Sequence, residues 1–493
     1  MTDLNRRMAS GAAWMVLLRL ADRGLGVIST MFLARLLVPA DFGLVAMAMT
    51  VFAVLEIMGT FSFDMALIQR DDAERRHYDT AWTFNALYGL VSAAVLVAVA
   101  SGAATLYREP RLTPILYVLA LCALIQGFEN IGIVAFQKDL ELHKEFRFRM
   151  IKRLSAFFVT LILAFWLRSY WALVLGILFS RAVGVWVSFM VHPYRPRASL
   201  AAARELLGFS KWMVYNNVLV FLVNRGTDFV IGKVVGPAAL GAYSVAYEVS
   251  NLPTTELVYP IMRAVFPGYA RMAGDRELLR QSYLDVLAVV VLAAVPAGLG
   301  IVALAEPVVL LFLGEKWRET VPLIEILGVY GVLRACSSNM GSVFLALGQP
   351  HVLAATGSLT VAVLVPLLWW LVPAHGSSGA AWAMLVTSSV MLPVMFALLM
   401  WTIDLRLRAL LATIWRPAIA GIAMLMFVGW LHQAWAASQP PLLLQLAALA
   451  PVVVVSYITV LLGLWGLAGR PKGGETMYLS WLRARWPVAA RKA

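Results

Sequence analysis

The sequence predicts an all-α membrane protein with about fourteen transmembrane helices, and two observations carry this prediction. Hydrophobic residues make up 61% of the 493 residues and charged residues only 14%, whereas a soluble chain carries roughly 25% charge. Apolar runs long enough to cross a bilayer also recur along the whole chain. Because lipid offers no hydrogen bonds to the backbone, such runs are expected to be helices. An ordinary soluble enzyme, a disordered chain and a disulfide scaffold are excluded.

Fourteen apolar runs are predicted to span the membrane, with approximate boundaries. They lie near 12–37, 42–68, 81–106, 112–136, 153–168, 171–192, 210–235, 238–267, 285–305, 321–347, 351–373, 376–400, 414–436 and 441–468. The eighth run is long and contains Pro253, Pro260 and Pro267, so we expect kinks in it.

The charges in the loops indicate the orientation. The net charge is +13, and most of the 40 lysines and arginines fall on one side once the N-terminus is placed inside the cell. Basic residues gather in cytoplasmic loops, so both termini are predicted to be cytoplasmic. The outer loops are too short for a catalytic domain, which favours a protein that is not an enzyme. The basic segments 139–153 and 195–211 are interpreted as amphipathic helices lying on anionic membrane lipids, with solvated linkers as the alternative.

A short internal repeat suggests two halves. PADFGLV at 39–45 joins the first two runs, and PAALGAY at 237–243 joins the seventh and eighth. An Arg-Gly pair precedes each turn, at Arg23 and at Arg225. The repeat predicts two six-span halves of the same orientation with a substrate between them, as in many transporters. Chance similarity of a Pro…Gly turn is the alternative.

Ionisable groups within spans are expensive unless they face protein or water, so they are the candidate functional residues. We predict a polar cavity between the halves. The candidate substrate-binding residues are Arg19, Arg23, Arg225, Arg181, Arg334, Asn217, Asn224, Tyr243 and Tyr247. The candidate ion-coupling residues are Asp22, Glu56, Asp64, Asp228 and Glu248. Local ion pairs are the alternative for each of these, and Arg35, Arg263 and Arg416 are expected to reach the membrane surface from span ends.

These residue types indicate the chemistry of the ligand. The arginine fork binds phosphate in bidentate fashion and keeps its charge when desolvated. Neighbouring tyrosines and amides suit sugar hydroxyls, so the ligand is expected to carry phosphate and sugar. The sequence has no P-loop of the form GxxxxGK[ST]. The histidines and cysteines show no metal-ligand spacing, and we expect neither a metal nor a cofactor.

Several short motifs resemble those of the polysaccharide flippases. They are SGAAW at 10–14, LARLL at 33–37 followed by FGL at 42–44, IQR at 68–70, AVFPGYA at 264–270, FLGEKW at 312–317 and GVLR at 331–334. The later motifs look like the branch that includes the colanic acid exporter. The superfamily also contains the multidrug and toxin extruders and the peptidoglycan-precursor flippases.

The resemblance implies two six-helix bundles in a V arrangement, at 1–195 and 196–402, followed by two further helices and a basic tail at 403–493. It implies a flippase of the bacterial inner membrane that exports an undecaprenyl-diphosphate-linked oligosaccharide by alternating access, coupled to an ion gradient. By position, Arg19, Arg23 and Arg225 match basic cavity residues of related flippases. The implied partners are the lipid-linked substrate and a polysaccharide polymerase or chain-length protein, and no nucleic acid.

Two other functions remain open. A small-molecule or cation antiporter of the same superfamily would favour acidic cavities, whereas this sequence has at least as many deep arginines as acids in its first spans. A membrane polysaccharide polymerase or ligase would need a large outer loop, which the short outer loops oppose.

Overall fold

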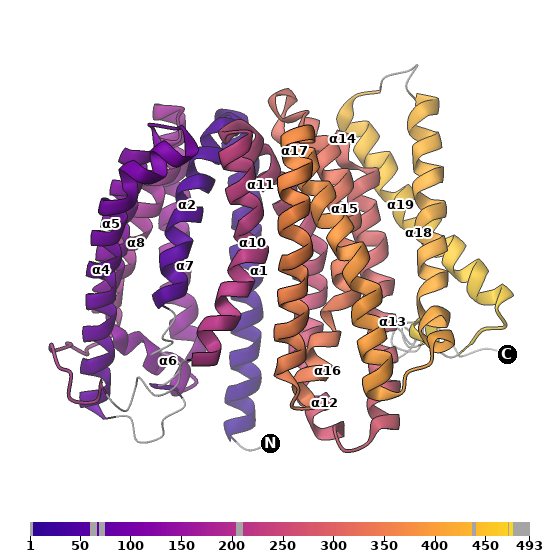
Figure 1. Cartoon of the computed structure of the whole chain (residues 1–493), viewed down its shortest axis with the longest axis horizontal. Helices are drawn as coiled ribbons and strands as arrows, with labels where there is room; N and C mark the ends of the chain where they lie inside the picture. The colour runs from indigo at the N-terminus through magenta and orange to yellow at the C-terminus, as the bar shows by residue number, and fades with distance from the viewer. Residues whose placement is uncertain are drawn as a thin grey trace, which may run out of the picture. The chain divides into compact units, whose positions relative to one another are not determined.

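The computed structural model describes residues 3–59, 67–68, 74–203, 211–435, 440–471 and 473–476. Helices make up most of this part of the chain, and none of these residues forms a β-strand (Figure 1). The predicted all-α class is therefore confirmed, and a helix covers at least part of every predicted span.

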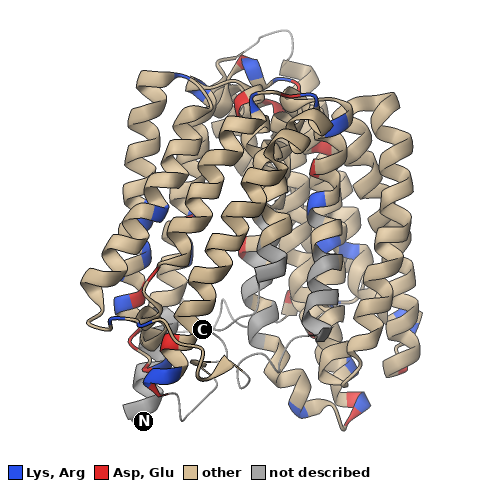
Figure 2. Cartoon of the chain, turned by 60° about the vertical axis from the view of Figure 1, so that its left-hand side comes forward, with Lys and Arg blue, Asp and Glu red and all other residues tan. Residues whose placement is uncertain are grey.

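The helices have the character of membrane spans. Within the described residues, eight helices are long and apolar enough to cross a membrane, or up to nine if the bent pair Leu112–Gly127 and Ile131–Lys138 is one span. Charged residues gather mainly towards the helix ends, and the helix middles carry few of them (Figure 2). A spanning helix needs this pattern because only its ends reach the polar headgroups. The chain is a multi-pass membrane protein, and the count of fourteen spans stays a prediction.

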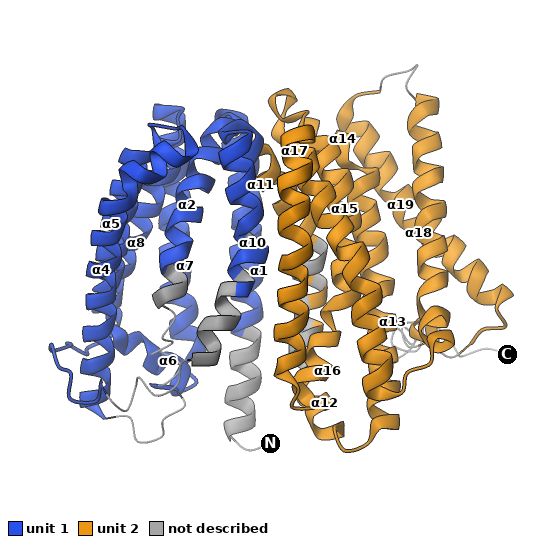
Figure 3. Cartoon of the chain, in the orientation of Figure 1, with its two compact units in different colours: residues 1–241 blue, residues 242–493 orange. Residues whose placement is uncertain are grey.

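The chain divides into two compact units, residues 1–241 and 242–493 (Figure 3). In unit 1, α4 packs along α5, α7 along α8, α1 on α7 and α2 on α10. The main helices of this unit are α1 (Asp3–Leu36), α2 (Pro39–Gly59), α4 (Arg75–Tyr107), α5 (Leu112–Gly127), α7 (Leu142–Leu167), α8 (Trp171–Val191) and α10 (Lys211–Val234).

Helix α11 (Pro237–Pro253) starts in unit 1, and from Ala242 onward it belongs to unit 2. The other long helices of unit 2 follow it in the chain. Helices α18 and α19 pack on each other and on α13, with a shared core that includes Tyr283, Met424 and Tyr457. The predicted three-part division of the chain stays a prediction. The remaining main helices are α12 (Tyr259–Met272), α13 (Arg276–Ala303), α15 (Thr320–Ser338), α16 (Met340–Ala346), α17 (Pro350–Ile403), α18 (Leu407–Trp435) and α19 (Leu442–Leu467).

The regular helix of the eighth span is interrupted after Pro253, while Pro267 lies inside α12, and the predicted kinks stay a prediction. Helix α11 ends at Pro253, and one π-helical turn, Thr254–Val258, separates it from α12. Proline lacks an N–H group and its ring clashes with the carbonyl of the preceding turn, so the regular helix is interrupted there.

The two repeated turns have the same local structure, and within unit 1 they contact each other. Pro39 begins α2 and Pro237 begins α11, at the helix start where proline is best tolerated. A Cβ atom at Gly43 would lie 1.6 Å from the carbonyl oxygen of Pro237, and one at Gly241 would lie 1.8 Å from that of Pro39. Each glycine therefore makes room for the proline backbone of the other turn. The repeat of six-span halves stays a prediction.

The interpretation of segment 139–153 as a separate interfacial helix is wrong. Its residues from 142 onward are the first turns of α7, which continues without a break into the apolar stretch that ends at Leu167. The basic residues therefore lie at the end of a spanning helix, because the helical hydrogen-bond ladder carries through the change from charged to apolar sequence.

The interpretation of 195–211 as an amphipathic helix is also wrong for most of its described part, since 192–200 forms neither a helix nor a strand. The segment is hydrogen-bonded to the start of α4. The carboxylate of Asp79 accepts hydrogen bonds from the Tyr194 hydroxyl at 2.5 Å and from the Arg197 backbone N–H at 2.8 Å. The second bond satisfies a backbone N–H that a helix would have paired internally. Residues 204–210 lie outside the described part.

Candidate functional site

In unit 2, two side chains of α11 bind the guanidinium of Arg334, which lies on α15. Its Nη1 donates hydrogen bonds to the Tyr247 hydroxyl oxygen at 2.9 Å and to Asn251 Oδ1 at 3.1 Å. Asn251 Nδ2 in turn donates to the Tyr247 carbonyl at 2.8 Å. Because Tyr247 and Asn251 are four residues apart on one face of α11, both acceptors reach the same nitrogen.

Tyrosine rings lie beside this guanidinium. The rings of Tyr243 and Tyr247 stack with their centroids 6.1 Å apart, and the Tyr330 ring lies 6.4 Å from that of Tyr247. The structure therefore brings together three predicted site residues, Arg334, Tyr243 and Tyr247.

The sequence places Asn251 in the same polar stripe as Tyr247, four residues earlier on the eighth span, but it did not lead to Tyr330. Tyr330 precedes Arg334 by four residues on α15. Residues at this spacing are neighbours on a helix surface, so the spacing is the signal that could have found Tyr330.

The neighbours of Arg334 differ from those of Arg149 and Arg225, which are each paired with a carboxylate. Arg334 is half-buried, and no carboxylate of the described residues forms an ion pair with it. Its partners are neutral oxygens, which leave its positive charge uncompensated. A charge in apolar surroundings without a counter-ion is costly, so an anion that contacts the guanidinium would be stabilised.

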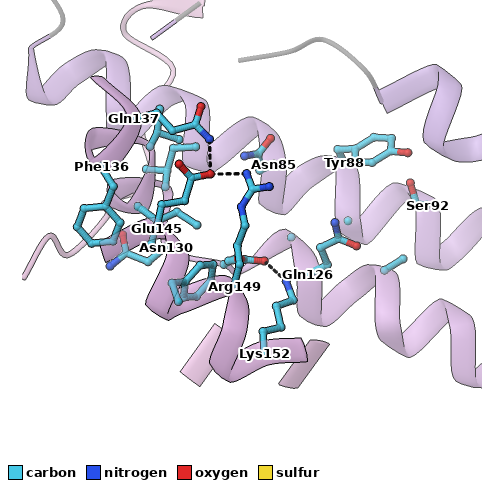
Figure 4. A pocket seen from close by; sticks show the side chains of 18 of the residues that line it. Asn85, Tyr88, Ser92, Gln126, Asn130, Phe136, Gln137, Glu145, Arg149 and Lys152 are labelled. Carbon is cyan, nitrogen blue, oxygen red and sulfur yellow. Dashed lines mark hydrogen bonds and ion pairs between the residues drawn. The ribbon is translucent and has the colours of Figure 1, made fainter. Parts of the chain in front are cut away.

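Unit 1 contains a cavity of about 720 Å³. This volume lies within the range of roughly 300–1,000 Å³ that is typical of small-molecule sites. Its walls come from α2, α4, α5, α7, the short α6 (Ala135–Lys138) and the 3-10 turn Ile131–Val134. The uncharged polar residues of the lining are Asn85, Tyr88, Ser92, Gln126, Asn130 and Gln137 (Figure 4).

Two ion pairs lie in the wall of this cavity. Arg149 Nη2 is 2.5 Å from Glu145 Oε1, and Gln137 Nε2 donates to the same oxygen at 2.7 Å. Figure 4 shows both contacts meeting at one oxygen of Glu145. Lys152 Nζ lies 3.3 Å from Glu129 Oε2. The two carboxylates and the two cations of the lining balance each other.

A broken helix creates this cavity. Helix α5 ends at Gly127, and the helical segment Ile131–Lys138 is bent from it by 67°. Asn130 holds the bend: its Oδ1 accepts from the Gly132 N–H at 2.9 Å, and its Nδ2 donates to the Tyr194 carbonyl at 2.8 Å. The irregular backbone at this break lines the cavity, since Glu129, Asn130 and Ile131 belong to its wall.

The sequence did not predict this cavity. It indicated an amphipathic helix at 139–153, which contains Glu145, Arg149 and Lys152, and a charge at Glu129 within the fourth span, but it did not bring them together. The spacing of four residues between Glu145 and Arg149 is the helix signal for their ion pair. The bend that brings Glu129 to Lys152 has no comparable signal, because the two residues lie on different elements.

Two of the predicted ion-coupling acids are paired with arginines. Asp22 on α1 lies 2.8 Å from Arg153 Nε on α7, measured to Oδ1. Asp228 on α10 is 8% exposed, and its Oδ2 lies 3.1 Å from Nη1 of Arg225. The Asp228–Arg225 contact is a local ion pair of the kind stated above as the alternative, whereas the arginine paired with Asp22 lies on another helix.

The structure places the other predicted residues without joining them into one site. Arg19 and Arg23 lie on α1, Arg181 on α8 and Glu248 on α11, and all four are half-buried. Asp64 lies outside the described residues, and so do the side chains of Glu56, Asn217 and Asn224.

The expectation that Arg416 reaches the membrane surface is wrong. Its side chain is buried, and its Nη1 lies 2.9 Å from Glu475 Oε1. The chain beyond α19 brings this carboxylate to the start of α18, so the charge is paired within the protein.

Sequence comparison finds curated relatives over most of the chain. The lipopolysaccharide biosynthesis protein WzxC of Escherichia coli (strain K12) is 28% identical over 349 residues, which cover 70% of this chain and 71% of WzxC. The succinoglycan biosynthesis transport protein ExoT of Rhizobium meliloti (strain 1021) is 25% identical over 472 residues, 93% of each chain. The teichuronic acid biosynthesis protein TuaB of Bacillus subtilis (strain 168) is 25% identical over 434 residues, 86% of this chain and 89% of TuaB.

Solved transporters share the fold. The lipid II flippase MurJ in an inward closed conformation aligns with a TM-score of 0.68 and 11% identity, over 92% of this chain and 99% of MurJ. An inward-facing multidrug resistance MATE transporter aligns with a TM-score of 0.58 and 13% identity, over 79% and 98% of the two chains.

The model of the polysaccharide biosynthesis protein family matches residues 32–322, which is more than half of the chain. This match agrees with the curated relatives and with the transporter fold. The chain therefore belongs to the polysaccharide biosynthesis protein family, and the resemblance seen in the sequence is confirmed.

Proposed function

We propose that this protein is a flippase that moves a diphosphate-linked oligosaccharide across the bacterial inner membrane and binds the diphosphate at Arg334. The uncompensated charge of Arg334 carries this proposal. Two neutral oxygens position the guanidinium, and they leave its charge for an anionic ligand. Phosphate suits the guanidinium fork, which offers several donors in one plane.

The groups beside Arg334 suit the sugar that follows a lipid diphosphate. Tyr247 is half-buried and donates no hydrogen bond to Arg334, so its hydroxyl lies where a sugar could contact it, while the buried rings of Tyr243 and Tyr330 pack beside it. The names of the relatives support a glycan, since they refer to lipopolysaccharide, succinoglycan and teichuronic acid.

The cycle and the orientation are part of the proposal. The substrate keeps its tail in lipid while its head crosses the membrane by alternating access, with both termini in the cytoplasm and an ion gradient as the driving force. Arg19, Arg23 and Arg225 are proposed as further diphosphate contacts, and Arg181 and the amides Asn217 and Asn224 as further substrate contacts. Among the acids, Asp22, Glu56, Asp64, Asp228 and Glu248 are the proposed coupling groups.

Transbilayer movement in proteoliposomes tests the proposal. The substrate is the diphosphate-linked glycolipid extracted from membranes of the cell that makes the protein. Arg334→Ala is expected to lower the rate by at least about tenfold, the effect of one lost charge-assisted contact. The control is Arg318→Ala, since Arg318 is an exposed arginine of unit 2 that is paired with Glu306 and Glu315.

Two outcomes would contradict the proposal. Wild-type rates in Arg334→Ala would remove Arg334 from the substrate path. Absence of glycolipid movement by the wild-type protein, together with efflux of a small organic cation, would favour the antiporter.

A further inference from the structure

We propose that the cavity of unit 1 is a second ligand site, which binds hydroxyl groups of the glycan with a carboxylate oxygen of Glu145 as acceptor. The inference rests on the proposed function, because it assumes a substrate with a glycan. It adds a site that lies wholly within unit 1 and contains none of the residues predicted above to bind substrate or to couple an ion.

The unequal environments of the two Glu145 oxygens lead to this inference. The side chain is 5% exposed, and Oε1 receives both Arg149 and Gln137. Oε2 is buried and has no hydrogen-bond partner among the described residues. A buried carboxylate oxygen without a donor is costly, and buried polar groups are almost always satisfied. A ligand hydroxyl in the cavity would supply the missing donor.

The charge balance of the cavity selects the class of ligand. Arg149 neutralises Glu145, and Lys152 neutralises Glu129. A metal ion or a phosphate would add a net charge to this balanced wall, whereas a neutral polyhydroxyl ligand would not. Arg334 has only neutral partners. We therefore assign the diphosphate to Arg334 and the sugar to the cavity of unit 1.

The rest of the lining supports a sugar. No other described residue bonds the side chains of Asn85, Ser92 or Gln126, so their donors and acceptors are available to a ligand (Figure 4). Phe136 and Phe148 add apolar surface to the same wall. A sugar ring has hydroxyls at its edge and C–H groups on its faces, and a lining of both kinds matches it. The volume of about 720 Å³ is enough for a short oligosaccharide rather than a single ion.

Equilibrium binding to the purified full-length protein in lipid nanodiscs tests the inference with two probes. One probe is undecaprenyl diphosphate without sugar, and the other is the diphosphate-linked glycolipid from the producing cell. The wild type is expected to bind the glycolipid more tightly. Glu145→Gln is expected to weaken glycolipid binding by about tenfold and to leave undecaprenyl diphosphate binding unchanged. Glu141→Gln is the matched control, because Glu141 lies four residues earlier, outside the cavity, and pairs with Lys144.

A second variant keeps the inference testable if Glu145→Gln does not fold. Gln126→Ala removes an amide that faces the cavity without breaking a bond to another described residue, and it is expected to weaken glycolipid binding alone. Wild-type affinities in both variants would overturn the inference. A lost gradient dependence of transport with unchanged binding would overturn it too, and would assign Glu145 to ion coupling.

The same measurement separates the two proposals. If the wild type binds neither lipid, the proposed function fails, and this inference fails with it. If Arg334→Ala weakens both lipids while Glu145→Gln weakens neither, the proposed function stands and the glycan site in unit 1 is wrong.

Discussion

The polar sites of the two units differ in the partners of their positive charges. In unit 1, Lys152 and Arg149 each have a carboxylate partner in the cavity wall. In unit 2, Arg334 has a hydroxyl and an amide oxygen as partners, and no carboxylate of the described residues pairs with it. Both patterns look alike in the sequence, as cations next to apolar residues. The counter-ion decides whether such a cation completes the structure or is available to an anionic ligand.

The largest expected effect is on stability, and it compares the same kind of substitution in both units. Lys152→Met should lower the free energy of unfolding by about 1–3 kcal/mol, because it leaves Glu129 in the cavity wall without its counter-ion. Arg334→Met should change it by less than about 1 kcal/mol, because the lost hydrogen bonds are offset by removal of an uncompensated charge. Thermal and denaturant unfolding of the purified variants in detergent would measure both.

A double variant serves as the control for this comparison. Replacing the carboxylate as well, in Glu129→Gln with Lys152→Met, should restore part of the lost stability, because no unpaired charge then remains. Equal losses in Lys152→Met and Arg334→Met would break the comparison, since they would show that Arg334 also has a charged partner.

An effect of intermediate size is expected from arginine-to-lysine substitutions. Arg334→Lys keeps the charge but loses the planar fork, so its affinity for undecaprenyl diphosphate should fall by about tenfold. The same substitution at Arg149 should leave this affinity unchanged, because Glu145 already occupies that guanidinium. Binding measurements on both variants would sharpen the comparison, and an equal loss at Arg149 would place the anion in the cavity of unit 1.

The smallest expected effect concerns pH at one end of unit 1. Burial, with Lys144 and Arg195 nearby, lowers the pKa of His192 from its ordinary value of 6.5. His192 Nδ1 accepts a hydrogen bond from the Tyr194 N–H at 3.2 Å, which requires the neutral ring.

The direction of this pH effect follows from the lowered pKa. The unfolded segment takes up its proton at a higher pH than the folded one, so stability is complete above about pH 6.5 and declines as the pH falls below it. The hydrogen-exchange protection factors at 192–200, corrected for the intrinsic pH dependence of exchange, should therefore fall in acid, while those in α15 should not. His192→Asn should remove the difference, and an unchanged pH response would exclude His192 as its origin.

Parts of both sites follow from spacing along single helices. Tyr243, Tyr247 and Asn251 recur every four residues, as do Tyr330 and Arg334, so each helix aligns its own polar groups. The hydrogen bond from Arg334 to Tyr247 joins two helices, so the spacing along either helix does not predict it. The pair Glu129–Lys152 could not be predicted, because it depends on the 67° bend after α5.

The sequence by itself determined the class of the protein. Its apolar composition requires helices that satisfy their own backbone in lipid, its repeated turns mark the starts of α2 and α11, and its motifs mark the family. Only the tertiary structure decided which charges are paired. An ion pair such as Asp22–Arg153 or Arg416–Glu475 joins residues that are far apart in the chain. Helix periodicity orders the side chains of one helix, but the partner of a charge is set by how separate helices pack.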